Sequence, residues 1–211
     1  IFLIAGEPSG DAIGARLMAA LKEEAGDAIK FSGIGGERMR EHGLASLFPM
    51  SDLSVMGLAE VIPHLPRLIH RLIRTVTEIE RLSPDVVVTI DSPDFCFRVA
   101  RRLKGKGIRL IHYVAPTVWA WKPGRARKIA AFLDHLLALL PIEPEIFKAA
   151  GLATTFVGHP VVESGADHGD GPGFRQRHGI AADVPLICVL PGSRHGETSR
   201  LLPIFERTLA M

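Results

Sequence analysis

Ile1-Phe2-Leu3-Ile4-Ala5-Gly6-Glu7-Pro8-Ser9-Gly10-Asp11 opens the chain with an apolar strand, a glycine turn and the start of a helical pattern. The same order returns near the end, where Leu186-Ile187-Cys188-Val189-Leu190 precedes Pro191-Gly192-Ser193-Arg194 and another helical stretch. In α/β folds, a glycine turn between a parallel strand and a helix is a place where anionic ligands bind. These two starts predict two Rossmann-like domains that face one cleft.

Between the two starts, segments rich in Val, Ile and Leu alternate with helical periods, which predicts an α/β fold with a doubly wound parallel sheet. Continuous apolar runs such as Val86-Val87-Val88-Thr89-Ile90 are typical of strands buried on both faces. We expect strands near residues 1–5, 28–33, 85–90, 108–114, 134–139 and 153–157. We expect helices near residues 11–24, 36–42, 66–83, 95–105, 123–132 and 142–150.

The chain divides into three parts by composition. Residues 1–160 are enough for one α/β domain with its own core. Residues 161–185 are expected to form a linker and domain junction, since they begin with a stretch rich in Gly, Asp, His and Pro. Residues 186–211 then form the first strand–helix unit of a second domain. We expect this unit to be incomplete and the chain to be a fragment.

The bulk composition indicates a soluble globular protein, with 47% hydrophobic and 23% charged residues. No apolar run approaches the roughly 20 residues of a membrane-spanning helix, and no signal peptide is recognisable. Cys96 and Cys188 lie far apart in elements expected to be buried, which is typical of reduced core thiols and not of a disulfide or zinc site. We expect no metal and no cofactor.

Residues 61–130 have a strong excess of positive charge, with 14 Lys and Arg against five acidic residues. The excess predicts an anionic partner, and leaves open whether it is a nucleic acid, an anionic lipid or a phosphorylated substrate. The alternative is that these cations are solvated on the outer helices.

An apolar segment lies beside the basic one. Residues 53–63 are apolar and broken by Gly57 and Pro63, and we expect them to cap the core, with a position on a membrane surface as the alternative. The helix expected from Pro66 has one apolar stripe at helical spacing, with its arginines off that stripe. The stripe consists of Leu68, Ile69, Leu72, Ile73, Val76, Ile79 and Leu82.

The first turn contains candidate functional residues at the carboxyl edge of the predicted sheet. Glu7 and Ser9 lie where ligands bind in this fold, and Gly6 and Gly10 allow close approach of the backbone. Asp11 is expected to cap the following helix. The alternative is that Glu7 and Ser9 only satisfy helix N–H groups. The turn lacks the GxGxxG pattern, so a dinucleotide dehydrogenase is not expected.

A second candidate turn, Asp91-Ser92-Pro93-Asp94-Phe95, follows the most hydrophobic strand. A carboxylate at that edge, next to a rigid proline turn, is well placed to act as a general base. Phe95 is expected to open the next helix, which makes Asp94 the better helix cap. We therefore assign the chemistry to Asp91.

Aromatic residues follow the next strand, from His112 to Lys122, and include both tryptophans and the only tyrosine. Large rigid aromatics beside polar groups suit a sugar or a lipid-bearing ligand. His112 and His159 can each be a core or hinge histidine instead. Near the end of the chain, Pro191-Gly192-Ser193-Arg194 combines a glycine, a hydroxyl and a cation at a helix start, which suits a pyrophosphate.

These motifs occur together in the order and spacing of a known family. They are Ala5–Asp11, Val55–Gly57, Asp91–Phe95, His112–Trp121, Phe156–Pro160 and Leu190–Arg194. On these residues the chain resembles the lipid-A-disaccharide synthases over its whole length. The resemblance implies a GT-B fold, with an N-terminal acceptor-binding domain and a C-terminal UDP-sugar-binding domain of which only the beginning is present.

The resemblance also implies an activity. The donor is UDP-2,3-diacylglucosamine, the acceptor is 2,3-diacylglucosamine 1-phosphate, and the products are the β-1,6-linked lipid A disaccharide 1-phosphate and UDP. The transfer inverts the anomeric centre and needs no metal. The implied enzyme is peripheral on the cytoplasmic face of the bacterial inner membrane, in contact with anionic lipid and with no nucleic acid.

The resemblance assigns catalytic roles to three residues. Asp91 would deprotonate the acceptor hydroxyl, Glu7 would organise the acceptor or the base, and Arg194 would neutralise the UDP leaving group. The residues expected to bind substrate are Gly6, Ser9, Gly10, Asp94, His112, Trp119, Trp121, Gly192 and Ser193. Since most of the donor domain would lie beyond Met211, we expect residues 1–211 alone to bind acceptor weakly and to give no measurable turnover.

Two other interpretations stay open. Another GT-B enzyme, either a UDP-GlcNAc epimerase or the peptidoglycan glycosyltransferase, shares the architecture, although the loop Val118–Trp121 is not expected there. A nucleic-acid-binding α/β module would use residues 61–130 and predicts a steep salt dependence of binding. The chain contains no recognised nucleic-acid motif.

Overall fold

The structure is a computed structural model that describes residues 1–53, 58–118, 124–163, 165, 167–192 and 195–210. The chain forms two compact units, Ile1–Ser164 and Gly165–Met211.

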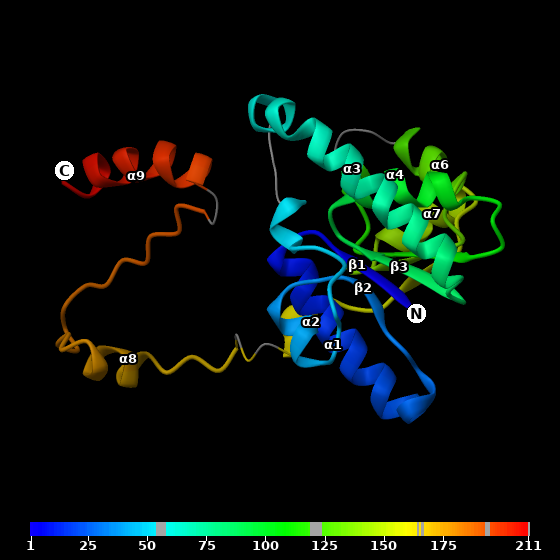
Figure 1. The fold of residues 1–211 in the computed structure, drawn as a ribbon. Helices are drawn as coiled ribbons and strands as arrows, with labels where there is room; N and C mark the ends of the chain where they lie inside the picture. The colour runs from blue at the N-terminus through cyan, green and yellow to red at the C-terminus, as the bar shows by residue number, and fades with distance from the viewer. Residues whose placement is uncertain (54–57, 119–123, 164, 166, 193–194, 211) are drawn as a thin grey trace. The chain divides into compact units, whose positions relative to one another are not determined.

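The first unit is built on a six-stranded parallel sheet with the strand order β2-β1-β3-β4-β5-β6 (Figure 1). The strands are β1 (Phe2–Ala5), β2 (Ser32–Ile34), β3 (Val86–Ile90), β4 (Arg109–Tyr113), β5 (His135–Ala138) and β6 (Thr154–Phe156). All five neighbouring pairs are parallel. The predicted doubly wound sheet is therefore confirmed, strand by strand.

Helices cover both faces of this sheet (Figure 1). One face holds α1 (Pro8–Ala25) and α2 (Glu37–Glu41), and the other holds α3 (Leu58–Leu82), α4 (Pro93–Leu103), α6 (Gly124–Ala130) and α7 (Glu143–Ala149). Short 3-10 turns occupy Gly26–Ala28, Met50–Asp52 and Pro160–Glu163. The chain runs from β1 to β2 in one direction and from β3 to β6 in the other, so right-handed crossovers place the two helix sets on opposite faces.

Successive side chains of a strand point to opposite faces of the sheet, so the first unit has one hydrophobic core on each face. In β1, Leu3 and Ala5 pack under α1 and α2, while Phe2 and Ile4 pack under the other helix layer. All four side chains are buried, as the continuous apolar run predicts for a strand covered on both faces.

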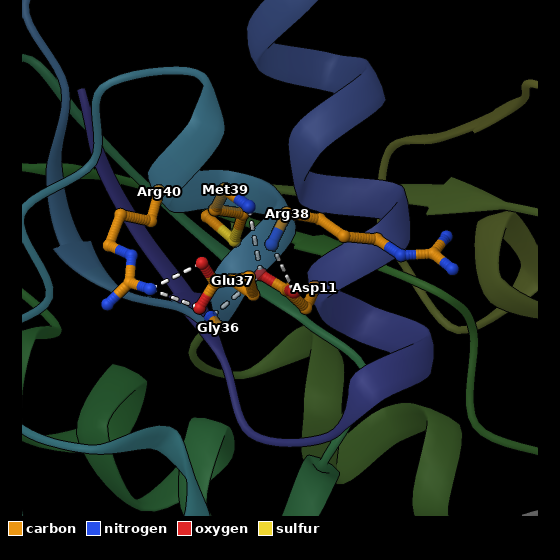
Figure 2. A network of polar contacts seen from close by, with 6 residues as sticks. All are labelled: Asp11, Gly36, Glu37, Arg38, Met39 and Arg40. Atoms are coloured by element: carbon orange, nitrogen blue, oxygen red, sulfur yellow. Dashed lines mark hydrogen bonds and ion pairs between the residues drawn. The ribbon is translucent and has the colours of Figure 1, made fainter.

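Helix α1 begins earlier than predicted. Pro8 lies in its first turn, where a fixed φ and a missing N–H are tolerated, and Glu7 is the N-cap residue. The prediction that Asp11 caps this helix is therefore wrong. Its buried carboxylate accepts hydrogen bonds from the backbone N–H groups of Gly36, Arg38 and Met39 at 2.7, 3.0 and 3.2 Å (Figure 2). Asp11 thus caps α2, a different helix.

The apolar stripe of α3 is divided between core and surface. Leu72, Val76 and Ile79 are buried against the sheet, whereas Ile69 and Ile73 are 48% and 57% exposed. A stripe of seven residues covers more of the helix circumference than one sheet face can bury. The stripe is therefore buried only in part, and Ile69, Ile73 and Leu82 remain exposed.

The second unit contains α8 (Gly171–Arg177) and α9 (His195–Leu209). The helix predicted after Arg194 is thus confirmed. The predicted strand at residues 186–190 is absent from the structure, and Cys188 is exposed instead of buried. A parallel strand needs a neighbour for its ladder hydrogen bonds, and none of the described residues pairs with this segment. The division into domains at residues 160 and 186 stays a prediction.

Candidate active site

The site lies where the strand order reverses. The chain leaves β1 towards β2 on one side and leaves β3 towards β4 on the other, so the carboxyl ends of β1 and β3 form the switch point at which this fold binds ligands. Ala5 and Ile90 are paired as the last residues of the two strands. The turns that follow these strands therefore leave the sheet side by side.

Two of the predicted site residues meet at this point. The hydroxyl Oγ of Ser9 donates a hydrogen bond to Oδ2 of Asp91 at 3.0 Å, across 82 positions of sequence. Oδ1 of Asp91 accepts a second hydrogen bond, from the backbone N–H of Ser92 at 2.9 Å. The carboxylate is half-buried and held by one donor on each oxygen.

The backbone around this carboxylate is strained. Asp91, Ser92 and Val114 have φ values of 53°, 43° and 80°, and all three directly follow β3 or β4. Such conformations cost on the order of 1–3 kcal/mol each, and they persist where surrounding contacts hold them. Here the N–H of Asp91 donates to the carbonyl of Tyr113 at 3.0 Å. Strain of this kind gathers at functional sites, which favours a function for the turn.

Two glycines allow the turn after β1 to pack closely against the end of β3 and the turn that follows it. A Cβ added to Gly6 would lie 2.5 Å from Oγ of Ser92, and one added to Gly10 would lie 3.2 Å from the carbonyl oxygen of Ile90. The structure thus gives both glycines a close approach to the neighbouring turn. Their predicted approach to a ligand stays a prediction.

A cavity of about 320 Å³ opens beside the carboxylate, lined by Ser9, Arg16, Asp91, Val114 and His159 among others. Nη1 of Arg16 donates to the carbonyl of Pro160 at 2.7 Å. Nδ1 of His159 accepts from the N–H of Val161 at 3.1 Å, which leaves Nε2 as the protonated ring nitrogen. The cavity therefore brings a hydrogen-bonded carboxylate, a cation and an imidazole to one place.

Arg16 lines the cavity but was not predicted as a site residue from the sequence. It lies on α1 seven positions, or two helical turns, after Ser9, so the two side chains share one face of the helix. That spacing was the available signal. Nothing in the local sequence indicates that the 3-10 turn at residues 160–163 would close over the same face.

Glu7 is half-buried at the N-cap position of α1, but its side chain makes no capping hydrogen bond to the helix. Glu7 is not among the described residues that line the cavity beside Asp91. Its role in organising acceptor or base stays a prediction.

Asp94 does not have its predicted role as a helix cap. Helix α4 begins at Pro93 with Ser92 as the N-cap residue, because proline suits the first turn, and Asp94 is exposed in that turn. The hydroxyl of Ser92 is itself buried without a hydrogen-bond partner among the described residues.

His112 lies in the core on β4. Its Nδ1 is 2.7 Å from Oγ1 of Thr89, whose hydroxyl donates to the carbonyl of Ile111, so Nδ1 carries the proton. The ring packs edge-on against Phe97, and burial lowers the pKa of His112 to about 3. His112 is thus a core residue of the sheet, and its predicted contact with substrate stays a prediction.

Several predicted site residues are not described by the structure. Trp119, Trp121, Ser193 and Arg194 lie outside the described residues, as does the motif Val55–Gly57. Gly192 is described in the second unit, where its φ of 102° favours glycine.

Within the described ranges, titratable side chains elsewhere form no second candidate for a metal or nucleophilic site. His, Cys, Asp and Glu form no cluster of three there that could hold a metal ion. Burial, reinforced by the nearby charge of Asp91, raises the pKa of the Cys96 thiol. A buried thiol in that state is a poor nucleophile.

The fold and the site together define a class: a doubly wound parallel α/β protein with a hydrogen-bonded carboxylate at its switch point. A family model described as "Lipid-A-disaccharide synthetase" matches residues 1–211. The chain belongs to this family, as the resemblance in its motifs predicted.

Three curated relatives named lipid-A-disaccharide synthase are similar to this chain. The protein from Rhodospirillum centenum is 64% identical over 99% of the chain and 53% of its own length. The protein from Paramagnetospirillum magneticum is 57% identical (100% and 55%), and that from Gluconobacter oxydans is 51% identical (99% and 50%). The chain thus spans about half the length of the curated relatives it matches.

Proposed function

We propose that residues 1–211 supply the acceptor-binding half of a glycosyltransferase. This enzyme transfers 2,3-diacylglucosamine from UDP-2,3-diacylglucosamine to 2,3-diacylglucosamine 1-phosphate. The observation that carries this proposal is the Ser9–Asp91 hydrogen bond at the switch point. It occurs in a chain whose residues 1–211 match the family model. The names of the relatives and the motif order favour this substrate pair over that of a UDP-GlcNAc epimerase or the peptidoglycan glycosyltransferase.

Asp91 acts as the general base in the proposed mechanism. Its carboxylate accepts the proton of the acceptor 6-hydroxyl while that oxygen attacks the anomeric carbon of the donor sugar. The bond from the anomeric carbon to the UDP oxygen breaks, and UDP leaves with the electron pair. Attack from the face opposite UDP inverts the anomeric centre and gives the β-1,6 linkage.

The neighbours of Asp91 position it for this step. Ser9 and the N–H of Ser92 fix the two carboxylate oxygens, so the base is oriented before the acceptor arrives. We assign Glu7 to organising the acceptor, and Arg194 to neutralising the charge that develops on UDP.

We further propose that the enzyme binds the cytoplasmic face of the inner membrane through α3. Leu65, Ile69 and Ile73 are spaced four residues apart and are 45%, 48% and 57% exposed, so they form an apolar ridge on one side of the helix. An exposed ridge of this kind beside a basic region suits a lipid surface that holds acylated substrates. Over the described residues, no helix has both the length and the apolarity to cross a membrane.

The transfer is tested with a fusion of residues 1–211 to the second half of the Rhodospirillum centenum relative. The fusion is given radiolabelled 2,3-diacylglucosamine 1-phosphate and UDP-2,3-diacylglucosamine, and the disaccharide is measured. We expect product from the fusion, a rate about a thousandfold lower from Asp91→Asn, and no product from residues 1–211 alone. Asp85→Asn, an exposed carboxylate at the other end of β3, is the matched control and should keep full activity.

Two results would contradict the proposal. One is a folded fusion that is inactive on the acylated pair but active on UDP-GlcNAc, which would return the function to the other GT-B interpretations. The other is full activity in Asp91→Asn, which would remove the base assignment while leaving the substrate pair intact.

A further inference from the structure

A second cavity, of about 990 Å³, lies between α4 and α6. Its walls contain five cationic side chains, which are Arg98, Arg101 and Arg102 of α4 and Arg125 and Lys128 of α6. We call this cavity and its five cations the basic groove. Spacings of three and four positions place the α4 residues on one helix face, and the α6 pair is likewise three apart. Both helices thus direct a cationic face into the same space.

The five cations make no ion pair with any acid in the part of the chain that the structure describes. By contrast, Arg40, Arg71, Arg81 and Arg177 each pair with a carboxylate elsewhere in the chain. Asp94 is the one acid among the described lining residues, and it lies more than ion-pair distance from all five. Convergence of like charges in a concavity is unfavourable unless an anion occupies it.

Part of the groove is ordered before any ligand binds. The guanidinium of Arg101 stacks over the ring of Phe132 at 4.8 Å, and Nη1 of Arg102 donates to the carbonyl of Arg98 at 3.1 Å. Ordered guanidinium groups lose less conformational entropy when they bind an anion, and their planar donors match two phosphate oxygens at once.

The floor of the groove is apolar. Phe97 and Ile129 are buried beneath the cationic walls, and Pro93 lies at one end. A ligand that fits has a phosphate for the walls and a less polar body for the floor. Pro93 and Asp94 follow Asp91 by two and three residues, so the groove starts beside the candidate active site.

We propose that the basic groove binds the phosphate group of a phosphorylated sugar or of a lipid headgroup. The groove itself does not depend on the transfer reaction. Only the identification of its ligand with the acceptor's 1-phosphate rests on the proposed function.

The experiment compares two double variants of the 211-residue chain that lose the same charge. Arg98→Gln/Lys128→Gln removes one cation from each wall, and Arg127→Gln/Lys148→Gln removes two exposed cations of α6 and α7 that do not line the groove. All four side chains are exposed, and thermal unfolding followed by circular dichroism verifies that both variants keep the fold.

Binding is measured at physiological salt with three probes. The first is glucosamine 1-phosphate, with glucosamine as the phosphate-free control. The second is phosphatidylcholine vesicles with and without phosphatidylglycerol, and the third is a short single-stranded RNA. We expect the groove variant to bind a phosphate probe about tenfold more weakly than the parent chain, and the control variant to bind it within about twofold.

Each outcome decides the proposal. If only the groove variant loses binding to glucosamine 1-phosphate, the ligand of the groove is a sugar phosphate. If the groove variant loses binding only to the anionic vesicles, the ligand is a lipid headgroup. Equal losses in both variants, no loss in either, or a selective loss on RNA alone overturns the proposal. One further outcome separates this proposal from the proposed function. If the fusion makes disaccharide while its Arg98→Gln/Lys128→Gln variant binds glucosamine 1-phosphate and anionic vesicles normally, the groove proposal is wrong and the proposed function stands.

Discussion

Asp11 and Asp91 are two aspartates of the same sheet edge whose surroundings differ. Asp11 is buried, and its carboxylate accepts three backbone hydrogen bonds from the start of α2 (Figure 2). Asp91 is half-buried beside a cavity and accepts two hydrogen bonds, one on each oxygen. A buried carboxylate that accepts three backbone hydrogen bonds stabilises the fold, whereas a half-buried carboxylate beside a cavity can take a proton from a ligand.

The largest expected effect is on catalysis at Asp91. Asparagine tolerates the left-handed backbone at this position and keeps one oxygen acceptor, but it cannot act as the base. We expect Asp91→Asn to lower kcat of the fusion about a thousandfold and to change stability by less than about 1 kcal/mol. Disaccharide assays and urea unfolding measure the two effects. A large loss of stability with little loss of rate would make Asp91 structural, like Asp11.

The next effect concerns the stability that Asp11 provides. Asp11→Ala removes the acceptor of three N–H groups, at least one of them buried, and we expect it to lower the free energy of unfolding by about 3 kcal/mol. Urea unfolding of the 211-residue chain measures this loss. The control is Glu37→Ala at the same helix start, where the exposed pair with Arg40 should contribute much less to stability than the cap. Equal losses in the two variants would contradict the capping role.

A smaller effect links stability to pH through His112. Its folded pKa is about 3 against 6.5 for the free side chain, so the unfolded chain binds more protons between these values. Stability therefore falls as pH drops below 6.5, by about 2 kcal/mol at pH 5. Unfolding curves at pH 7.5 and 5 measure this change.

The control for His112 keeps the contact and removes the titration. His112→Asn retains an N–H directed at Thr89 but has no proton to gain in this range. It should be less stable than the parent at both pH values and lack most of the pH-dependent loss. An unchanged pH dependence would assign the effect to other groups.

The smallest effect is at Ser9, which positions the base and does not transfer the proton itself. Ser9→Ala removes the hydrogen bond to Oδ2 of Asp91, and we expect kcat to fall about tenfold with KM little changed. Ser9→Thr restores a hydroxyl and should recover most of the rate. A Thr variant as slow as the Ala variant would show that the hydroxyl is not what matters.

Strand and helix periods were sufficient to predict the sheet, its parallel order and the turns after β1 and β3. Ser9 and Asp91 were both expected at the carboxyl edge of the sheet, but the hydrogen bond between them was not predicted. The contacts of Asp11 were not predictable in this way. A capping motif specifies that a carboxylate seeks helix N–H groups, but tertiary packing decides which helix supplies them.

Burial was the other property that local patterns left open. His112 follows the alternation of β4 into the core, which was one of the alternatives that its sequence left open. Ile69 and Ile73 fit the periodic stripe of α3, yet both are exposed. Both outcomes depend on how much area the opposing layer offers, and a single segment does not contain that information.

The contact between Gly6 and Ser92 has a consequence for how this family can diverge. A methyl group at position 6 would overlap the side chain at position 92, so the two positions are not free to drift one at a time. Ser92 has a φ of 43°, a conformation that glycine adopts without cost. An alanine at position 6 should therefore be accepted only with a glycine at position 92, and the pair should exchange as a unit along a lineage.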